Sequence, residues 1–114
     1  MIRLLLFTTS AVLVSLAGLG CSSSSSSSPV LTLGVVLPTS GPNAAVGQEA
    51  ADAARMAVAE WTQRFADQGY NLKINVQDDA SDPKQAVAAA YAISGDPTTF
   101  GVVAHYNSGC FLPA

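Results

Sequence analysis

Basic residues are scarce in this chain, and their scarcity limits the partners that it can bind. Five lysines and arginines stand against eight aspartates and glutamates, which gives a net charge of −3 with the single histidine neutral. Arg3 lies near the amino end, and the other four are scattered between Arg55 and Lys84. Nucleic-acid binding needs a basic patch that neutralises phosphates, so the composition argues against nucleic acid as a partner.

Cysteine is scarcer still, because Cys21 and Cys110 are the only two in 114 residues. If Cys21 is modified, Cys110 has no partner within this chain and no disulfide framework is available. We therefore expect Cys110 to be a small buried apolar residue.

The amino-terminal residues have the pattern of an export signal. Arg3 supplies one positive charge, and an apolar run from Leu4 to Leu19 follows it, interrupted by four hydroxyl residues. This order is typical of a secretory signal peptide, which we assign to residues 1–20. The alternative is a membrane-spanning helix, for which a run of this length and polarity is marginal.

Cys21 follows the apolar run directly and precedes seven consecutive serines. A cysteine at this junction resembles the lipidated residue of a bacterial lipoprotein, and Gly20 is the small residue that such a cleavage site needs. Gly18 departs from the pattern, because an aliphatic residue is usual three positions before the cysteine. We predict lipidation of Cys21 and a flexible lipid-anchored tether at residues 21–29, with ordinary signal cleavage nearby as the alternative.

The remaining residues alternate between strand-like and helix-like segments. Strands are predicted at residues 30–37, 72–77 and 100–104, and helices at 47–68 and 83–94. The first and third strands are continuous apolar runs, whereas the second alternates with period 2 and is typical of a strand nearer a sheet edge. Asp82, followed by Pro83, is the predicted N-cap of the second helix. Such alternation predicts βαβ units, and hence an α/β fold: an open three-layer parallel sheet in the order 2-1-3 with helices on both faces.

Helical periodicity also predicts which residues of the first helix face the sheet. They are Ala50, Ala53, Ala54, Ala57, Val58, Trp61 and Phe65. The segment from 38 to 46 is rich in Pro, Gly, Ser and Asn and is predicted to be a loop.

Polar side chains gather in the loops that follow the strands. In an open α/β sheet, ligands bind outside the carboxyl ends of the strands where the strand order reverses, here between the first and third strands. Ser108 is the strongest candidate for ligand contact, because its hydroxyl and nearby backbone N–H groups lie where a helix begins and can receive an anion. Its alternative role is a helix N-cap. Tyr106 and Asn107 share this loop and either line the site or pack as loop residues.

The acidic residues Asp78, Asp79 and Asp82 are candidates for metal binding. A calcium loop needs longer ligand spacing and a glycine at its sixth position, which this segment lacks. We interpret Asp82 as an N-cap and the other two as solvated loop residues. No metal and no cofactor are predicted.

Three residues, His105, Ser108 and Cys110, are candidates for catalysis. A nucleophile elbow reads G-x-S-x-G, but Tyr106 and Cys110 stand where the glycines are needed. A Cys–His pair remains conceivable, but no third group that would orient it is evident. We expect no catalytic residue and no enzyme activity.

Three stretches carry a resemblance to a known family. They are LGVVLPTSGPNAAVGQ (33–48), DDASDPKQAV (78–87) and AHYNSGCFLPA (104–114). With them, the chain from residue 31 onward resembles the first lobe of branched-chain amino acid binding proteins, which capture substrates for ABC importers. Members of that family close two hinged lobes around an amino acid. The resemblance implies that residues 30–114 are the amino-terminal part of the first lobe, which they do not complete.

The resemblance also implies roles for particular residues. Ser108 is expected to bind the α-carboxylate of the ligand. Ala45 and Val46, in the loop after the first strand, are expected near the ligand, with a buried loop hydrophobe as the alternative for Val46.

The chain departs from the family pattern at several positions. Ala104 replaces a glycine before His105, and Phe111 replaces a small hydroxyl residue. Some relatives join two of these loops by a disulfide, and the matching positions hold Ser81 and Asn107.

The function that follows is capture of a small amino acid, branched-chain or similar, for an ABC permease. The protein is expected in the periplasm or cell envelope, held to a membrane through Cys21. A ligand-sensing receptor of the same fold is the alternative, and an exported α/β enzyme is the less favoured one.

Overall fold

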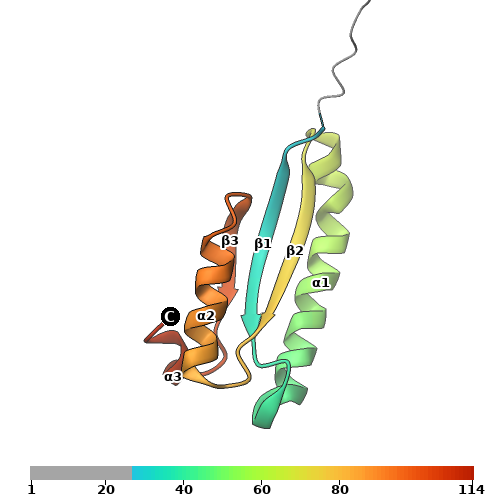
Figure 1. Cartoon of the computed structure of the whole chain (residues 1–114). Helices are drawn as coiled ribbons and strands as arrows, with labels where there is room; N and C mark the ends of the chain where they lie inside the picture. The colour runs from blue at the N-terminus through green and yellow to red at the C-terminus, as the bar shows by residue number, and fades with distance from the viewer. Residues whose placement is uncertain (1–26) are drawn as a thin grey trace, which may run out of the picture.

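The structure is a computed structural model that describes residues 27–114, and its centre is strand β1 (Val30–Leu37). Strands β2 (Asn71–Asp78) and β3 (Thr99–Ala104) pair with β1 in parallel on either side, so the order is β2-β1-β3, as predicted (Figure 1). The predicted signal peptide and Cys21 lie outside the described residues.

The three strands run in register toward one edge of the sheet. The pairing of β1 with β2 is unbroken from Val30 opposite Asn71 to Leu37 opposite Asp78. The pairing of β1 with β3 has one irregularity after Thr32. There the hydroxyls of Thr32 and Thr98 share a 2.7 Å hydrogen bond. All three carboxyl ends therefore lie together.

Two helices cover opposite faces of the sheet. Helix α1 (Ala44–Asp67) packs Ala51 against Val35 and Leu37, whereas helix α2 (Pro83–Ser94) packs Ala89 and Ile93 against Val36. Because successive residues of a strand point to opposite faces, Val35 belongs to the core under α1 and Val36 to the core under α2. The predicted three-layer α/β architecture is confirmed (Figure 1).

Helix α1 begins earlier than predicted, and only some of the residues predicted to face the sheet are buried. A 3₁₀ turn, η1 (Gly41–Asn43), leads directly into it, so Ala45 and Val46 lie in its first turn and not in a loop. Its buried residues are Gly47, Ala51 and Val58, with Ala54 and Phe65 partly buried, whereas Ala50, Ala53, Ala57 and Trp61 are exposed. In a helix with so many alanines, apolar residues occur on every side, and periodicity alone does not select the inward face.

Gly47 fixes which face of α1 meets the sheet. A Cβ on this residue would lie 2.0 Å from the carbonyl oxygen of Pro38, the fully buried residue that follows β1. Only glycine allows the helix to approach the backbone this closely.

Strand β3 is one of the two edge strands of the sheet formed by the described residues, and it is apolar. Phe100 and Val102 are each 53% exposed, and Val103 is 48% exposed. This is the unpaired apolar edge that parallel sheets normally cover.

Among the helices of residues 27–114, none combines the length and the apolar character that crossing a bilayer requires.

Substituting Gly47→Ala tests the close approach of α1 to Pro38. The clash of Cβ with a backbone oxygen should exceed the roughly 1 kcal/mol that alanine gains in helix propensity, so the free energy of unfolding should fall by about 2 kcal/mol or more. Urea unfolding measures the change. The control is Gly109→Ala, where a Cβ meets nothing within 4 Å. Equal stability of the Gly47→Ala variant and the parent protein would contradict the packing.

Candidate functional site

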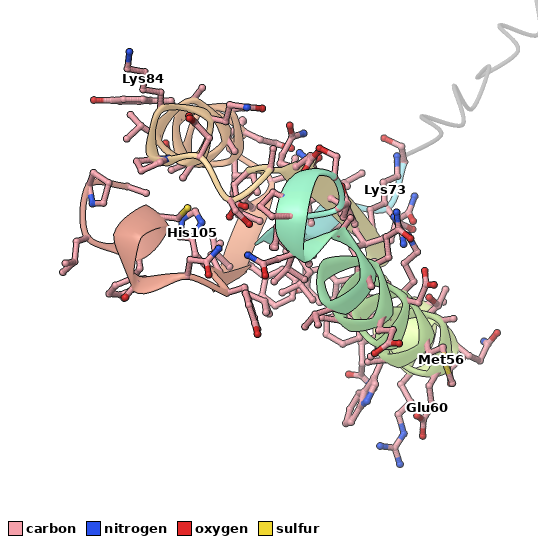
Figure 2. The ribbon with its side chains drawn as sticks, turned by 90° about the horizontal axis from the view of Figure 1, so that it is seen from below. Met56, Glu60, Lys73, Lys84 and His105 are labelled. Atoms are coloured by element: carbon pink, nitrogen blue, oxygen red, sulfur yellow. The ribbon has the colours of Figure 1, made fainter. Side chains whose placement is uncertain are left out.

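The candidate site is built on three loops at the carboxyl ends of the strands. We call them the carboxyl-end loops, and they comprise residues 38–43, 79–82 and 105–107. Figure 2 looks onto this end of the sheet and shows His105 inside it, between the strand ends and the short helix α3 (Ser108–Phe111). The predicted convergence of polar loops at one edge is confirmed.

The loops after β1 and β2 are tied by polar contacts. The backbone N–H of Ser40 donates to Asp78 Oδ1 at 3.1 Å, and Asn43 Nδ2 donates to Ser81 Oγ at 2.9 Å. Between them, Gly41 has a φ of 75° and lies so close to the Ala80 carbonyl that a Cβ would approach it to 2.7 Å. These two loops therefore form one rigid unit.

The loop after β2 turns through two left-handed residues, Ala80 and Ser81, with φ values of 46° and 60°. Asp82 then caps α2, because its side chain accepts hydrogen bonds from the N–H groups of Lys84 at 2.9 Å and Gln85 at 3.0 Å. The predicted N-cap is confirmed.

Asp78 is exposed, as predicted, and its carboxylate organises the turn. Partial desolvation acts to raise its pKa, but hydrogen bonds from Ser40, Ala80 and Thr39 outweigh that effect and lower the pKa below 3.8. The charged form of Asp78 therefore stabilises the loops after β1 and β2 together.

Asp79 is not the solvated loop residue that the sequence suggested, because its side chain is 0% exposed. Its Oδ2 lies 3.0 Å from Nδ1 of His105, and its Oδ1 accepts the N–H of Ser81 at 2.9 Å. Its own N–H donates to the Leu37 carbonyl at 3.2 Å. Two adjacent aspartates at a strand end point to opposite sides, and sequence alone does not say which one points inward.

His105 is the hydrogen-bond partner of Asp79, and the sequence did not reveal this pairing. Its side chain is only 4% exposed, although the residue as a whole is half-buried. Asp79 supplies the orienting group that no sequence pattern revealed, since the two residues are 26 positions apart. The available signal was an acidic pair and a histidine that follow two strands of the same sheet.

Ser108 is the first residue of α3, and Asn107 is its N-cap position. The alternative role of Ser108 as an N-cap is therefore wrong. Its side chain is exposed, and among the described residues its hydroxyl has no hydrogen-bond partner. Tyr106 is 53% exposed, and Asn107 is half-buried. All three lie at the carboxyl end of β3, as predicted.

Ala45 and Val46 lie at the same end of the sheet, on the first turn of α1. Val46 is 43% exposed and Ala45 is also exposed, so the alternative of a buried loop hydrophobe does not apply.

Cys110 is buried and free, as expected, with 1% of its surface exposed. Burial raises the pKa of its thiol, and the negative charges of Asp79 and Asp82 raise it further. A thiol held in its neutral form is a poor nucleophile, which disfavours a Cys–His mechanism here.

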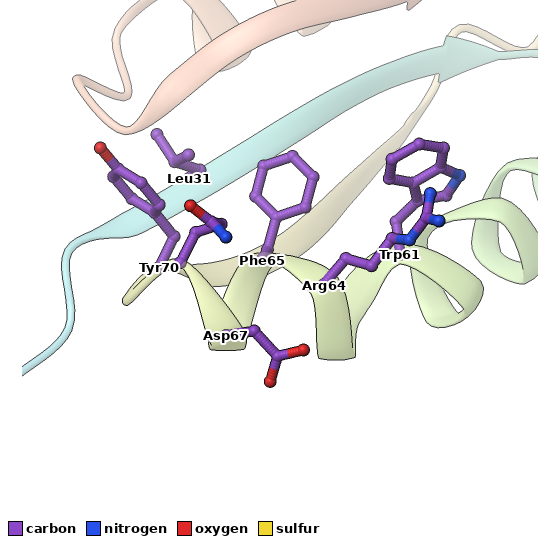
Figure 3. Close-up of a pocket in the computed structure, with 7 residues that line it drawn as sticks. Leu31, Trp61, Arg64, Phe65, Asp67 and Tyr70 are labelled. Carbon is purple, nitrogen blue, oxygen red and sulfur yellow. The ribbon is translucent and has the colours of Figure 1, made fainter.

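Within residues 27–114, no group of three or more His, Cys, Asp or Glu side chains has the arrangement of a metal site. A hollow of about 630 Å³ lies elsewhere, at the amino end of β1 and the carboxyl end of α1 (Figure 3). Its lining includes Leu31, Phe65 and Tyr70. Arg64 and Trp61 line it too, with the Arg64 guanidinium 4.9 Å from the centroid of the Trp61 ring. It is remote from the carboxyl-end loops.

Comparison with known proteins places this architecture in a family. The profile of the family described as "Periplasmic binding protein" matches residues 30–112. The chain therefore belongs to the periplasmic binding protein family.

Several curated relatives are similar to this chain. The "Leu/Ile/Val-binding protein homolog 1" of Brucella abortus (strain 2308) is 35% identical over 82 residues, which are 72% of this chain and 22% of that protein. The "Leu/Ile/Val-binding protein BraC3" of Rhizobium johnstonii is 36% identical over 83 residues, which are 73% of this chain and 22% of that protein. The "Leu/Ile/Val-binding protein homolog 2" of Brucella abortus (strain 2308) is 35% identical over 83 residues, with the same coverage of 73% and 22%. The chain thus spans about a fifth of the length of these relatives.

The lowered pKa of Asp78 predicts a pH dependence of stability. Its ionised form stabilises the fold fully above the ordinary pKa of 3.8, and this contribution is lost as the pH falls through the lower pKa of the folded state. Asp78→Asn should reduce the free energy of unfolding at pH 7 by about 1 kcal/mol or less, because the carboxylate is exposed. The difference should vanish near about pH 2, measured by urea unfolding.

The control for this prediction is Glu60→Gln on the exposed side of α1, which leaves the loop contacts of Asp78 in place and should not reproduce the loss of stability at pH 7. A difference between Asp78→Asn and the parent protein that is the same at both pH values would contradict the assignment.

Proposed function

We propose that the protein is an extracytoplasmic solute-binding protein that captures a small amino acid, of the branched-chain class or similar, for an ABC importer. The observation that carries the proposal is Ser108. Its exposed hydroxyl, which has no hydrogen-bond partner within residues 27–114, lies at the carboxyl end of β3 beside the switch point between β1 and β3. Membership in the periplasmic binding protein family and relatives named for leucine, isoleucine and valine support it.

The proposed roles of the site residues follow from their positions. Ser108 donates a hydrogen bond to the α-carboxylate of the ligand, and Tyr106 and Asn107 line the same pocket. Ala45 and Val46 form part of the wall on the side of α1, where exposed apolar atoms suit a small aliphatic ligand. The net charge is −3 and the basic residues are scattered along the sequence, which disfavours a multiply charged anion as the ligand in place of an amino acid.

Residues 30–114 are, in this proposal, the amino-terminal part of the first of two lobes. Hinge closure of the two lobes would then bury the ligand, and the second lobe would complete the pocket. The exposed apolar edge of β3 supports this division, because such an edge is normally covered by a further strand.

Phe111 marks a difference from the pattern that the chain resembles. Phe111 is 62% exposed, and its ring meets the His105 ring edge to face with 6.5 Å between the ring centroids. It makes an aromatic contact where a hydroxyl would offer a polar one. We propose that the carboxylate pocket of this protein has one polar contact fewer on this side.

Export and anchoring are proposed from the sequence of the first 29 residues. The signal peptide at 1–20 would direct the protein across the inner membrane, and lipid on Cys21 would hold it at a membrane surface. The serine-rich segment would let the binding domain reach its permease.

The alternative of an exported α/β enzyme has little support. Cys110 is buried with a raised pKa, and the side chain of His105 is only 4% exposed. Neither residue is available at the surface where Ser108 lies.

Substituting Ser108→Ala tests the proposed carboxylate contact. Loss of a hydrogen bond to a charged group should weaken leucine binding roughly tenfold or more, measured by isothermal titration calorimetry on the complete two-lobed protein. Ser94→Ala is the matched control, because Ser94 is an exposed serine whose hydroxyl bonds only to the Tyr91 carbonyl at 3.3 Å. Unchanged affinity in the Ser108→Ala protein would refute the assigned role.

Substituting Cys21→Ser tests the lipid anchor. Cells supplied with labelled fatty acid should label the parent protein but not this variant, because the thiol is the attachment point. Cys110→Ser is the control and should keep the label, since Cys110 is buried in the folded domain. Labelling of the Cys21→Ser protein, or none of the parent protein, would rule out the anchor.

A further inference from the structure

A buried acid–base pair lies directly behind the candidate ligand site. Asp79 Oδ2 and His105 Nδ1 are 3.0 Å apart, and the two side chains are 0% and 4% exposed. A carboxylate only accepts hydrogen bonds, so the pair requires the proton on Nδ1 and the donor to be His105. Removing either partner would leave a buried polar group unsatisfied, which is costly in a site closed to water.

Asp79 connects the ends of all three strands. Its backbone N–H donates to Leu37 at the end of β1, and its Oδ2 binds His105 after β3, while the residue itself follows β2. Its Oδ1 holds the left-handed residue Ser81 through the N–H of that residue at 2.9 Å. Its carbonyl accepts the N–H of Asp82 at 2.7 Å, so the N–H, the carbonyl and both carboxylate oxygens of Asp79 all have partners at this end of the sheet.

His105 transmits this constraint to the ligand loop. Only Tyr106 and Asn107 separate it from Ser108, and none of these three residues is fully buried. On the far side, the N–H groups of Cys110 and Phe111 both donate to the Asn107 carbonyl at 3.0 Å, and the Phe111 ring faces that of His105. The loop is thus held at its two ends, by the pair with Asp79 and by the turn of α3.

We propose that Asp79 and His105 are positioning residues of the ligand site: the pair holds the Tyr106–Asn107–Ser108 loop in the geometry that binds the ligand carboxylate. The inference rests on the proposed function, because it assigns a ligand to Ser108. Asp79 and His105 touch no ligand themselves and act through the loop that Ser108 ends.

Two substitutions of His105 separate positioning from simple packing. Asparagine carries its amide nitrogen at the δ position and keeps a donor for Asp79, whereas glutamine carries it at the ε position and loses that donor. Glutamine is closer to histidine in volume. Packing alone therefore predicts that His105→Gln is the milder change, and positioning predicts that His105→Asn is the milder one.

The experiment uses the complete protein and two readouts. Leucine affinity is measured by calorimetry, and amide hydrogen exchange is followed at residues 106–108. His105→Gln should weaken leucine binding about tenfold or more and speed exchange at these amides by a similar factor, whereas His105→Asn should stay within about threefold of the parent protein. Ile93→Val in the core under α2 is the control for general destabilisation and should change neither readout.

Asp79→Asn tests the same hydrogen bond by changing its acceptor, and it replaces His105→Gln in the experiment if that variant does not fold. It keeps the shape of the side chain but leaves one acceptor for two donors, so the same loss of affinity and protection is expected. Equal behaviour of the Gln and Asn variants at position 105, or better retention by Gln, would overturn the proposal.

The two readouts also separate this inference from the proposed function. If the parent protein binds no amino acid, the proposed function fails. The exchange rates then decide whether the pair orders the loop: faster exchange in His105→Gln alone supports the positioning role, and unchanged exchange refutes it.

Discussion

The parallel pairing of β1 with both of its neighbours is the constraint on which the structure depends. It places the carboxyl ends of three strands at one edge, so segments that are distant in sequence become neighbours there. Burial of β1 on both faces enforces this arrangement, because Val35 and Val36 are 0% exposed and each contributes to a different core. Shifting β1 by one residue would exchange the two cores, so the register is strongly specified. The loops that form the site inherit their positions from this register.

The strands and their order were predictable from the sequence because the signals involved are local. An apolar run, an alternating run and an N-cap followed by proline each identify an element without knowledge of its partners. Asp82 is a clear case, because its role depends only on the N–H groups of the residues that follow it. The 2-1-3 order followed from the alternation of the second strand, which set it at an edge.

The inward face of α1 and the burial of Asp79 were not predictable, for a different reason. Both depend on contacts between segments that are far apart in the chain. The approach of Gly47 to Pro38 selects one face of an alanine-rich helix, and the pattern of apolar residues in the helix does not reveal that contact. Asp79 and Asp78 are chemically identical, and only the presence of His105 on the other side of β1 distinguishes their roles. The position of Ser108 at the end of a strand was predictable because that signal is local, whereas the pair behind it was not.

In the first turn of α1, a position where a side chain would clash, Gly47, lies next to an exposed position, Val46, where side chains of different size fit. Gly47 contacts the backbone of Pro38 and admits no side chain, whereas Val46 is exposed and packs under no such restriction. Over evolutionary time, the residue at 46 is therefore able to change in size or polarity while the helix that carries it stays in place. Single substitutions at this exposed position would change the surface at the carboxyl end of the sheet without first requiring compensating changes in the fold. Rigidity at one residue thus makes the neighbouring residue free to diversify.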